Sequence, residues 1–459
     1  MVSKVMGWGR VLWLVAVLSM AFSSPWAALV PAIHDYTGGS APLPQLISQT
    51  GLYQDMAARP REVSSGIIAF SVNTPLWSDG ASKERYVDLP AGNTIIPTDS
   101  DGYTFPDKTV MVKNFYIDTV YGDSTTKVII ETRFLVHRKL TDGFGALRQR
   151  YYGFTYAWNK DQSDAVLVPT DSTRMVIVRN VSLNGQMMGK RWTYPSQGDC
   201  NLCHTGRRQY LGFVTQQLNM PIAALSGKNQ LQDLFEKGIL TLNPVAGKPT
   251  AHHWYSLKDQ TATKEQRIRS YLAANCSHCH GNENITTLHI LDYFNPLQDI
   301  RYYNDDPLKN HGGWVDKKAG PGKLIAPGHP DSSYFMQKVT TRPVSLVSMG
   351  TAGMPPLATF QIDSTMVELM RQWVCELGSV DPASPGCKLP VGTPDASMWA
   401  SVSVFNSPLK NQAYIPGQRL EFDGRRLLII TGKNGGEQAR DVGGKVIWTR
   451  PAPHMWFHQ

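Results

Sequence analysis

The 459-residue sequence lacks several features that would assign it to a well-known class of protein. It has no long biased tract, and its content of 42% hydrophobic and 18% charged residues excludes a disordered or fibrous chain. Its net charge is +8, but the Lys and Arg residues form no basic run, zinc-finger pattern or helix-turn-helix pattern. We therefore expect a globular protein of about two or three domains that does not bind nucleic acid.

Long apolar runs are also scarce. Val11–Phe22 follows Lys4 and Arg10, and it falls short of the ~20 residues that span a bilayer. This pattern predicts a signal peptide over residues 1–28, cleaved between residues 23 and 32, and an uncleaved anchor is the alternative. No later stretch is long enough to cross a membrane, so we expect an exported, periplasmic chain with no stable membrane span.

Cysteine is rare as well, yet four of the six cysteines fall in two copies of one pattern. Segments 200–204 and 276–280 both read Cys-x-x-Cys-His, the attachment motif of c-type haem. Two thiols a short turn apart can form thioethers with the haem vinyl groups, while the adjacent histidine is presented to the iron. We therefore expect two covalently bound haem c groups. The predicted thioether cysteines are Cys200, Cys203, Cys276 and Cys279, and the predicted proximal ligands are His204 and His280.

Other interpretations of these cysteines fit less well. The Cys-x-x-Cys halves of a zinc site are usually ~15–20 residues apart, whereas more than seventy separate Cys203 from Cys276. A thioredoxin-like pair requires a single motif in a βαβ context. A disulfide within either motif would be strained and would leave the following histidine unexplained. The remaining pair, Cys375 and Cys387, predicts a structural disulfide.

Apolar patterning divides the chain into four regions after the signal peptide. These are a β-rich domain at 33–195, a first haem segment at 196–260, a second haem domain at 261–380 and a β-rich extension at 388–459. Strands are expected at 109–117, 127–136, 151–158, 175–181, 398–405, 426–431 and 445–449, with a hairpin turn at 121–124. The expected fold class is α+β: a sandwich-like or barrel-like β domain, a mainly α-helical cytochrome c domain and a short β-rich C-terminal appendage.

Two helices are expected around the second haem motif. Thr263 followed by Gln266 is a capping box, which predicts a helix over 264–275 that ends at the motif. A second helix has an apolar face, with Asp363 as its N-cap and Gly378 as its stop.

The sixth iron ligands are less clearly marked. Met354 lies in a proline-stiffened loop before the last helix and is the predicted ligand of the second haem, with Met349 as its rival. No similar loop follows the first motif. Met220, His252, His253, a residue of the β domain and water all stay candidates there.

The chain resembles a family of periplasmic two-haem c-type cytochromes with a β-rich N-terminal region, most of which are functionally uncharacterised. The resemblance spans roughly residues 51–378. It includes both haem motifs with Asn275 before the second, and the segments Asn73–Asp79, Phe105–Pro106, Glu131–Arg133, Pro327–Ser333 and Met354–Pro356. It implies the cofactor and the fold but no particular activity.

Three functions follow from these observations. The first is an electron carrier that passes single electrons between its haems and redox partner proteins, after haem attachment by the cytochrome c maturation machinery. The second is a dihaem oxidoreductase, such as a peroxidase-like enzyme, with an open coordination site at the first haem. Its polar groups would come from Arg207, Arg208, His252 and His253. The third is a binding module in which the haems form an electron relay.

Overall fold

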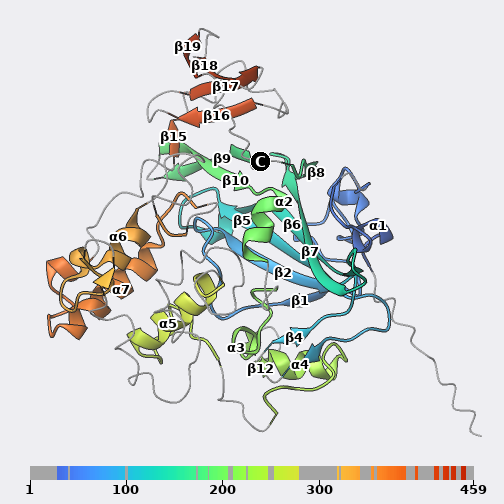
Figure 1. Ribbon diagram of the computed structural model, residues 1–459, viewed down its shortest axis with the longest axis horizontal. Helices are drawn as coiled ribbons and strands as arrows, with labels where there is room; N and C mark the ends of the chain where they lie inside the picture. The colour runs from blue at the N-terminus through green and yellow to red at the C-terminus, as the bar shows by residue number, and fades with distance from the viewer. Residues whose placement is uncertain are drawn as a thin grey trace, which may run out of the picture.

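The computed structural model shows a mixed α and β fold built around one large antiparallel sheet (Figure 1). The structure describes residues 28–39, 42–98, 102–171, 174–183, 186–204, 210–223, 226–246, 253–278, 318–319, 322–341, 353–355, 359–388, 399–401, 418–422, 427–433, 436–440 and 446–450. The predicted signal peptide lies outside these residues except for Ala28. Within them, no helix is long and apolar enough to cross a membrane.

The large sheet has six strands in the order β1-β2-β5-β6-β7-β8, and all neighbours are antiparallel. Its strands are β1 (Ile68–Phe70), β2 (Ser82–Asp88), β5 (Val110–Asp118), β6 (Lys127–Thr141), β7 (Leu147–Trp158) and β8 (Ala165–Val168). The predicted hairpin around 121–124 joins β5 to β6, and both strands begin within one residue of their predicted starts.

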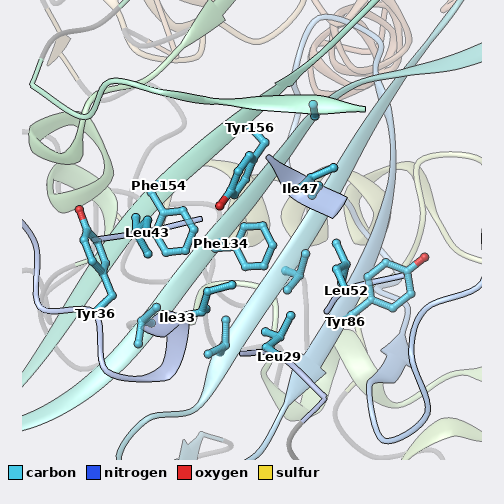
Figure 2. Close-up of a cluster of buried hydrophobic side chains, with 14 of the residues drawn as sticks. Leu29, Ile33, Tyr36, Leu43, Ile47, Leu52, Tyr86, Phe134, Phe154 and Tyr156 are labelled. Carbon is cyan, nitrogen blue, oxygen red and sulfur yellow. The ribbon is translucent and has the colours of Figure 1, made fainter. Parts of the chain in front are cut away.

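The two faces of this sheet bury different side chains, because successive residues of a strand point to opposite faces. On one face Phe134, Phe154 and Tyr156 pack with residues from the start of the described chain, including Leu29 and Ile33 (Figure 2). Phe134 and Phe154 stack with ring centroids 5.0 Å apart. The other face is left for the helices that follow β10, and the candidate site lies there.

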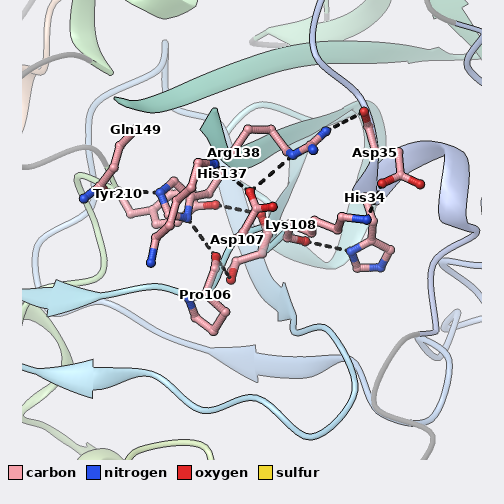
Figure 3. Close-up of polar contacts among 11 residues, drawn as sticks. His34, Asp35, Pro106, Asp107, Lys108, His137, Arg138, Gln149 and Tyr210 are labelled. Atoms are coloured by element: carbon pink, nitrogen blue, oxygen red, sulfur yellow. Dashed lines mark hydrogen bonds and ion pairs between the residues drawn. The ribbon is translucent and has the colours of Figure 1, made fainter. Parts of the chain in front are cut away.

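Short helix α1 (Pro31–His34) is tied to the sheet by polar contacts (Figure 3). The Arg138 guanidinium donates to the carbonyl oxygen of Asp35 at 2.6 Å and lies 3.3 Å from the Asp107 carboxylate. A ring nitrogen of His34 lies 2.7 Å from the carbonyl oxygen of Lys108, whose own ammonium pairs with Asp35 at 2.6 Å. These contacts fix the chain directly after the predicted signal peptide.

The remaining strands form smaller sheets. They are β3 (Ile96–Pro97), β4 (Tyr103–Thr104), β9 (Arg174–Leu183), β10 (Gln186–Tyr194), β11 (Pro221–Ile222), β12 (Lys228–Asn229), β13 (Lys318–Ala319), β14 (Gly322–Lys323), β15 (Trp399–Ser401), β16 (Gln418–Phe422), β17 (Leu427–Lys433), β18 (Gly436–Arg440) and β19 (Val446–Arg450). Strand β15 of the predicted C-terminal extension pairs with β10 in the order β15-β10-β9, so its first strand completes a sheet of the β region. Strands β16 to β19 form a four-stranded meander, of which the sequence analysis missed β16 and β18.

Helices dominate the residues after β10. They are α2 (Gln197–Cys203), α3 (Thr215–Leu218), α4 (Gln230–Glu236), α5 (Lys264–Asn275), α6 (Tyr334–Thr340) and α7 (Ser364–Leu377). The 3-10 turns η1 (Ile47–Gln49) and η2 (Ser124–Thr126) precede β10, and η6 (Pro330–Ser332) and η8 (Pro385–Cys387) follow it. Helix α5 has the predicted capping box of Thr263 and Gln266. Helix α7 begins after Asp363, whose side chain accepts from the backbone N–H of Met366, and ends at Gly378.

Helices α5, α6 and α7 share one apolar core, which includes Ile268, Leu272, Met336, Val367 and Trp373. Next to α7, the sulfur atoms of Cys375 and Cys387 are bonded as a disulfide, the pairing that the sequence predicted.

Candidate functional site

The first Cys-x-x-Cys-His motif is carried by α2, a helix that the sequence analysis did not predict. The Ser196 hydroxyl accepts from the backbone N–H of Asp199, and the Asp199 carboxylate accepts from the N–H of Ser196 at 2.8 Å. This reciprocal cap starts the helix, which places Cys200 and Cys203 three residues apart on one face. The signal that would have found α2 is the Ser-x-x-Asp form of the capping box.

Helix α2 lies directly against β7 of the large sheet. The side chain of Gln197 accepts from the backbone N–H of Gly153 at 2.7 Å. A Cβ atom at Gly153 would lie 2.8 Å from the sulfur of Cys200, closer than any side chain tolerates. The absence of a side chain at Gly153 therefore sets how closely the motif approaches the sheet.

A cavity opens beside the motif, and Cys200, Cys203 and His204 all line it. Its volume is about 210 Å³, and it opens to solvent. Sites that enclose a small organic ligand are typically about 300–1,000 Å³, so this cavity would enclose only part of an organic cofactor. The cavity therefore brings together three of the six residues predicted to hold haem.

The wall opposite α2 is largely apolar and aromatic. It includes Phe70, Leu135, Tyr210, Phe213 and Trp77. Tyr210 is held in place because its hydroxyl donates to the carbonyl oxygen of Thr109 at 2.9 Å. Such walls suit the flat, apolar body of a porphyrin and exclude water from its faces.

The thiols of the two motifs are not tuned for redox exchange. Burial raises the pKa of Cys200 to about 11, although the nearby Arg133 opposes this shift, and burial raises the pKa of Cys276 to about 12. Reactive cysteines of disulfide oxidoreductases have lowered pKa values instead. Among the described cysteines only Cys375 and Cys387 form a disulfide. The raised pKa values of Cys200 and Cys276 therefore fit a thioredoxin-like pair poorly.

The floor of the cavity also carries cations that the sequence analysis missed. Arg85, Lys113 and Arg133 come from β2, β5 and β6, and all three line the cavity. No local pattern marks them, because their proximity depends on the register of three strands. Each of these strands carries other charged residues as well, and β2 alone contains Lys83, Glu84 and Asp88, so the sequence does not single out these three cations.

The second motif begins where α5 ends. Cys276 follows the last residue of α5, its backbone N–H donates to the carbonyl oxygen of Leu272 at 2.9 Å, and its side chain packs against the core of α5, α6 and α7. Cys279 and His280 lie outside the described residues. Met354 is described, and its backbone N–H donates to the carbonyl oxygen of Lys338 at the end of α6. Its position relative to His280 is therefore not described.

Segment Asn73–Asp79, which contributed to the family resemblance, connects the two motifs. Its residues Thr74, Leu76 and Trp77 line the cavity beside the first motif. The backbone N–H of Trp77 also donates at 2.6 Å to the side chain of Asn275, the residue before Cys276. Ala274 of α5 lines the same cavity, so the second motif starts close to the cavity of the first.

The far end of this segment is fixed to the chain before α7. The Asp79 carboxylate accepts from the backbone N–H groups of Phe360 and Gln361 at 2.8–2.9 Å, and the indole N–H of Trp77 donates to the carbonyl oxygen of Gln361 at 2.8 Å. Segment Asn73–Asp79 is therefore bonded both to α5 and to the entry of α7. Its buried hydrogen bonds explain why a polar segment lies between two apolar cores.

Two of the predicted candidates for the sixth ligand of the first haem are not on this cavity. Neither Met220 nor His253 lines it. His252, Arg207, Arg208 and Met349 lie outside the described residues. The lining side chains with a possible ligand atom include Met111 and Lys113 on β5, which belong to the class of β-domain ligand that the sequence left open.

No protein-family model, curated protein or solved structure matches this chain.

Proposed function

We propose that this chain is an exported dihaem c-type cytochrome that passes single electrons between its two haems and redox partner proteins. The observation that carries the proposal is the cavity in which Cys200, Cys203 and His204 face apolar, aromatic walls. The proposal includes the finer layout, a sandwich-like β domain followed by a cytochrome c-like helical part, and haem attachment by the cytochrome c maturation machinery. When bound, each haem would supply one-electron redox chemistry.

The residues of the chain have distinct parts in this function. Cys200 and Cys203 would hold one haem through thioethers, and Cys276 and Cys279 the other. His204 and His280 would be proximal ligands, with Met354 as the sixth ligand of the second iron. Tyr210 and Phe213 would form part of an apolar wall beside the first haem, and an apolar environment tunes the reduction potential of an iron centre.

Within this proposal, the start of the described chain favours the upstream cleavage position. Leu29 is only 3% exposed, and its backbone N–H donates at 2.9 Å to the fully buried carboxylate of Asp88. Cleavage after Ala32 would remove Leu29 from this core, whereas cleavage after Ser23 would leave it in place. We therefore propose that the mature chain begins near Ser24.

The direct test is covalent haem in the protein matured with the cytochrome c machinery. We expect two haems per chain by mass and haem staining, and about half the staining in Cys200→Ala and in Cys276→Ala. The double variant should stain no more than background. Full staining in either single variant would rule out that site, and unstained wild-type protein would rule out the function.

A second candidate function, a dihaem oxidoreductase, is supported by the opening to solvent of the cavity that His204 lines. A cavity that reaches solvent would admit a small molecule to the first site. Rapid, stoichiometric binding of carbon monoxide at the His204 haem of the reduced protein would favour this enzyme over the electron carrier. A first haem that stays low-spin and excludes carbon monoxide would favour the carrier.

A further inference from the structure

Three cations lie side by side in the floor of the cavity. Arg85 pairs directly with Lys113 across β2 and β5, and Lys113 pairs directly with Arg133 across β5 and β6. Directly opposed residues of antiparallel strands have Cβ atoms about 4.5–5.5 Å apart, and like charges at that distance destabilise a sheet. A row of three cations therefore needs compensating negative charge.

Only one of these cations is neutralised by a neighbour. The guanidinium of Arg133 makes two hydrogen bonds of 2.6 and 2.9 Å to the carboxylate of Glu131, which is fully buried. Lys83, on the same face, donates to the carbonyl oxygen of Leu76 at 2.7 Å. The charge of Glu131 also raises the pKa of Lys113, but neither Glu131 nor Lys83 makes a hydrogen bond or ion pair with Arg85 or Lys113.

Arg85 and Lys113 have no hydrogen-bond or ion-pair partner in the part of the chain that the structure describes. Arg85 is 8% exposed, so water replaces little of the missing charge. Among the described residues that line the cavity, the one carboxylate is that of Asp199, and one of its oxygens caps α2. Burial, with the charges of Arg85 and Arg133, lowers the pKa of Lys113 to about 7, which shows how poorly compensated this position is.

We propose that Arg85 and Lys113 form a carboxylate-binding site in the cavity beside Cys200. A guanidinium matches the two oxygens of a carboxylate, and two adjacent cations match two carboxylates or one dicarboxylate. The surrounding apolar wall, which includes Phe70 and Leu135, selects a ligand with an apolar body. Two sources carry this chemistry: the propionates of a haem held at Cys200 and Cys203, and a free small carboxylate. The first source rests on the proposed function.

The test compares the full-length, haem-loaded wild type with Arg85→Gln/Lys113→Gln. Arg138→Gln is the matched control, because Arg138 is also buried on the sheet but does not line the cavity. Arg85→Lys keeps the positive charge of Arg85. Lys113→Met is a second variant that removes the positive charge of Lys113 without adding a polar group. Haem content, the two midpoint potentials and the melting temperature with and without succinate are measured for each protein.

The two sources give different results. If propionates occupy the site, the double variant lowers the midpoint potential of one haem, because losing positive charge favours the oxidised state. Arg85→Lys and Arg138→Gln then keep the wild-type potential, and succinate leaves the wild-type melting temperature unchanged. If a free carboxylate binds, succinate raises the melting temperature of wild type, and the double variant weakens its binding at least about tenfold, which corresponds to 1.4 kcal/mol.

The proposal is overturned if the double variant and Lys113→Met keep both wild-type potentials while succinate stabilises neither wild type nor variant. Failure of the proposed function gives another result. A wild-type chain that carries no covalent haem would exclude the cytochrome, and succinate binding by that chain would still support the carboxylate site.

Discussion

The segment that carries Cys200 and Cys203 is a seven-residue helix laid against a sheet, whereas Cys276 follows a twelve-residue helix packed in an apolar core. Burial raises the pKa of Cys200, and the charge of Arg133 opposes this shift. Burial alone raises the pKa of Cys276. The first copy of the five-residue pattern therefore lies in a cation-rich environment, and the second copy begins in an apolar one. In the proposed function, the local sequence would set the attachment chemistry and the surrounding fold would set the electrostatics.

The largest expected effect is a steric one that disturbs the first motif and leaves the second intact. In Gly153→Ala the new methyl group would lie 2.8 Å from the Cys200 sulfur, and overpacking of this kind costs about 1–3 kcal/mol. We expect α2 to be displaced and haem content to fall toward one per chain, measured by mass. Gly143→Ala is the control, because a Cβ at Gly143 meets no atom within 4 Å. Two haems in Gly153→Ala would mean that α2 tolerates displacement.

The next effect is confined to the second motif. Met354→Ala should lower the potential of one haem and remove the long-wavelength absorption band of Met-to-iron bonding, because a thioether ligand raises the potential. Met56→Ala is the control for loss of a partly buried methionine, because Met56 packs against the core that contains Leu29 and Ile33. A band that persists in Met354→Ala would assign the ligand to Met349 or another residue.

One contribution to the pH dependence of stability should come from Lys113, beside the first motif. The pKa of Lys113 is about 7 in the folded chain against an ordinary value of 10.5, owing first to burial and then to Arg85 and Arg133. Between pH 7 and pH 10.5, Lys113 is protonated in the unfolded chain and has lost its proton in the folded chain. The free energy of unfolding therefore rises with pH over this range.

Lys113→Met should flatten this rise when urea unfolding of the haem-free chain is followed by tryptophan fluorescence from pH 7 upward. The exposed Lys258→Met is the control and should keep the wild-type slope. A bound carboxylate would also flatten the slope, because it stabilises the charged amine. Equal slopes in wild type and Lys113→Met without any carboxylate would show that Lys113 titrates normally.

The smallest effects compare the helix caps. Ser196→Ala and Thr263→Ala each remove a capping hydroxyl, which typically costs about 1 kcal/mol. Helix α5 is held by a core on its buried face, so Thr263→Ala should lower the melting temperature without loss of haem. Helix α2 is short, so Ser196→Ala should also reduce the haem attached at Cys200 and Cys203. Equal haem loss in both variants would show that α2 depends on its cap no more than α5 does.

Patterns that depend on neighbours in sequence were predicted well. The cap at Thr263, the helix from Asp363 to Gly378 and the hairpin around 121–124 all follow from residues a few positions apart. Strands β5 and β6 follow from β-branched and aromatic runs in the same way. Each of these features is fixed by local hydrogen bonding or by local apolar periodicity, so the sequence is sufficient to find it.

Features that depend on distant residues were missed. The cation row exists only because the strands of Arg85, Lys113 and Arg133 align in one register, and a single sequence does not specify register. The contact of Trp77 with Asn275 joins residues 198 positions apart. The exclusion of Met220 and His253 from the cavity is likewise a matter of tertiary placement, which the spacing from Cys203 does not encode.

The hydrogen bonds of segment Asn73–Asp79 have a thermodynamic consequence. The segment touches the first motif through the cavity wall and the second through Asn275, so it is a shared boundary of both sites. If an event at one site changes this segment, it changes the binding free energy at the other site, and the reverse effect has the same magnitude because linkage is reciprocal. In the proposed dihaem protein, a titration of either site would then report the state of its neighbour, and the two reduction potentials would not be independent constants of the molecule.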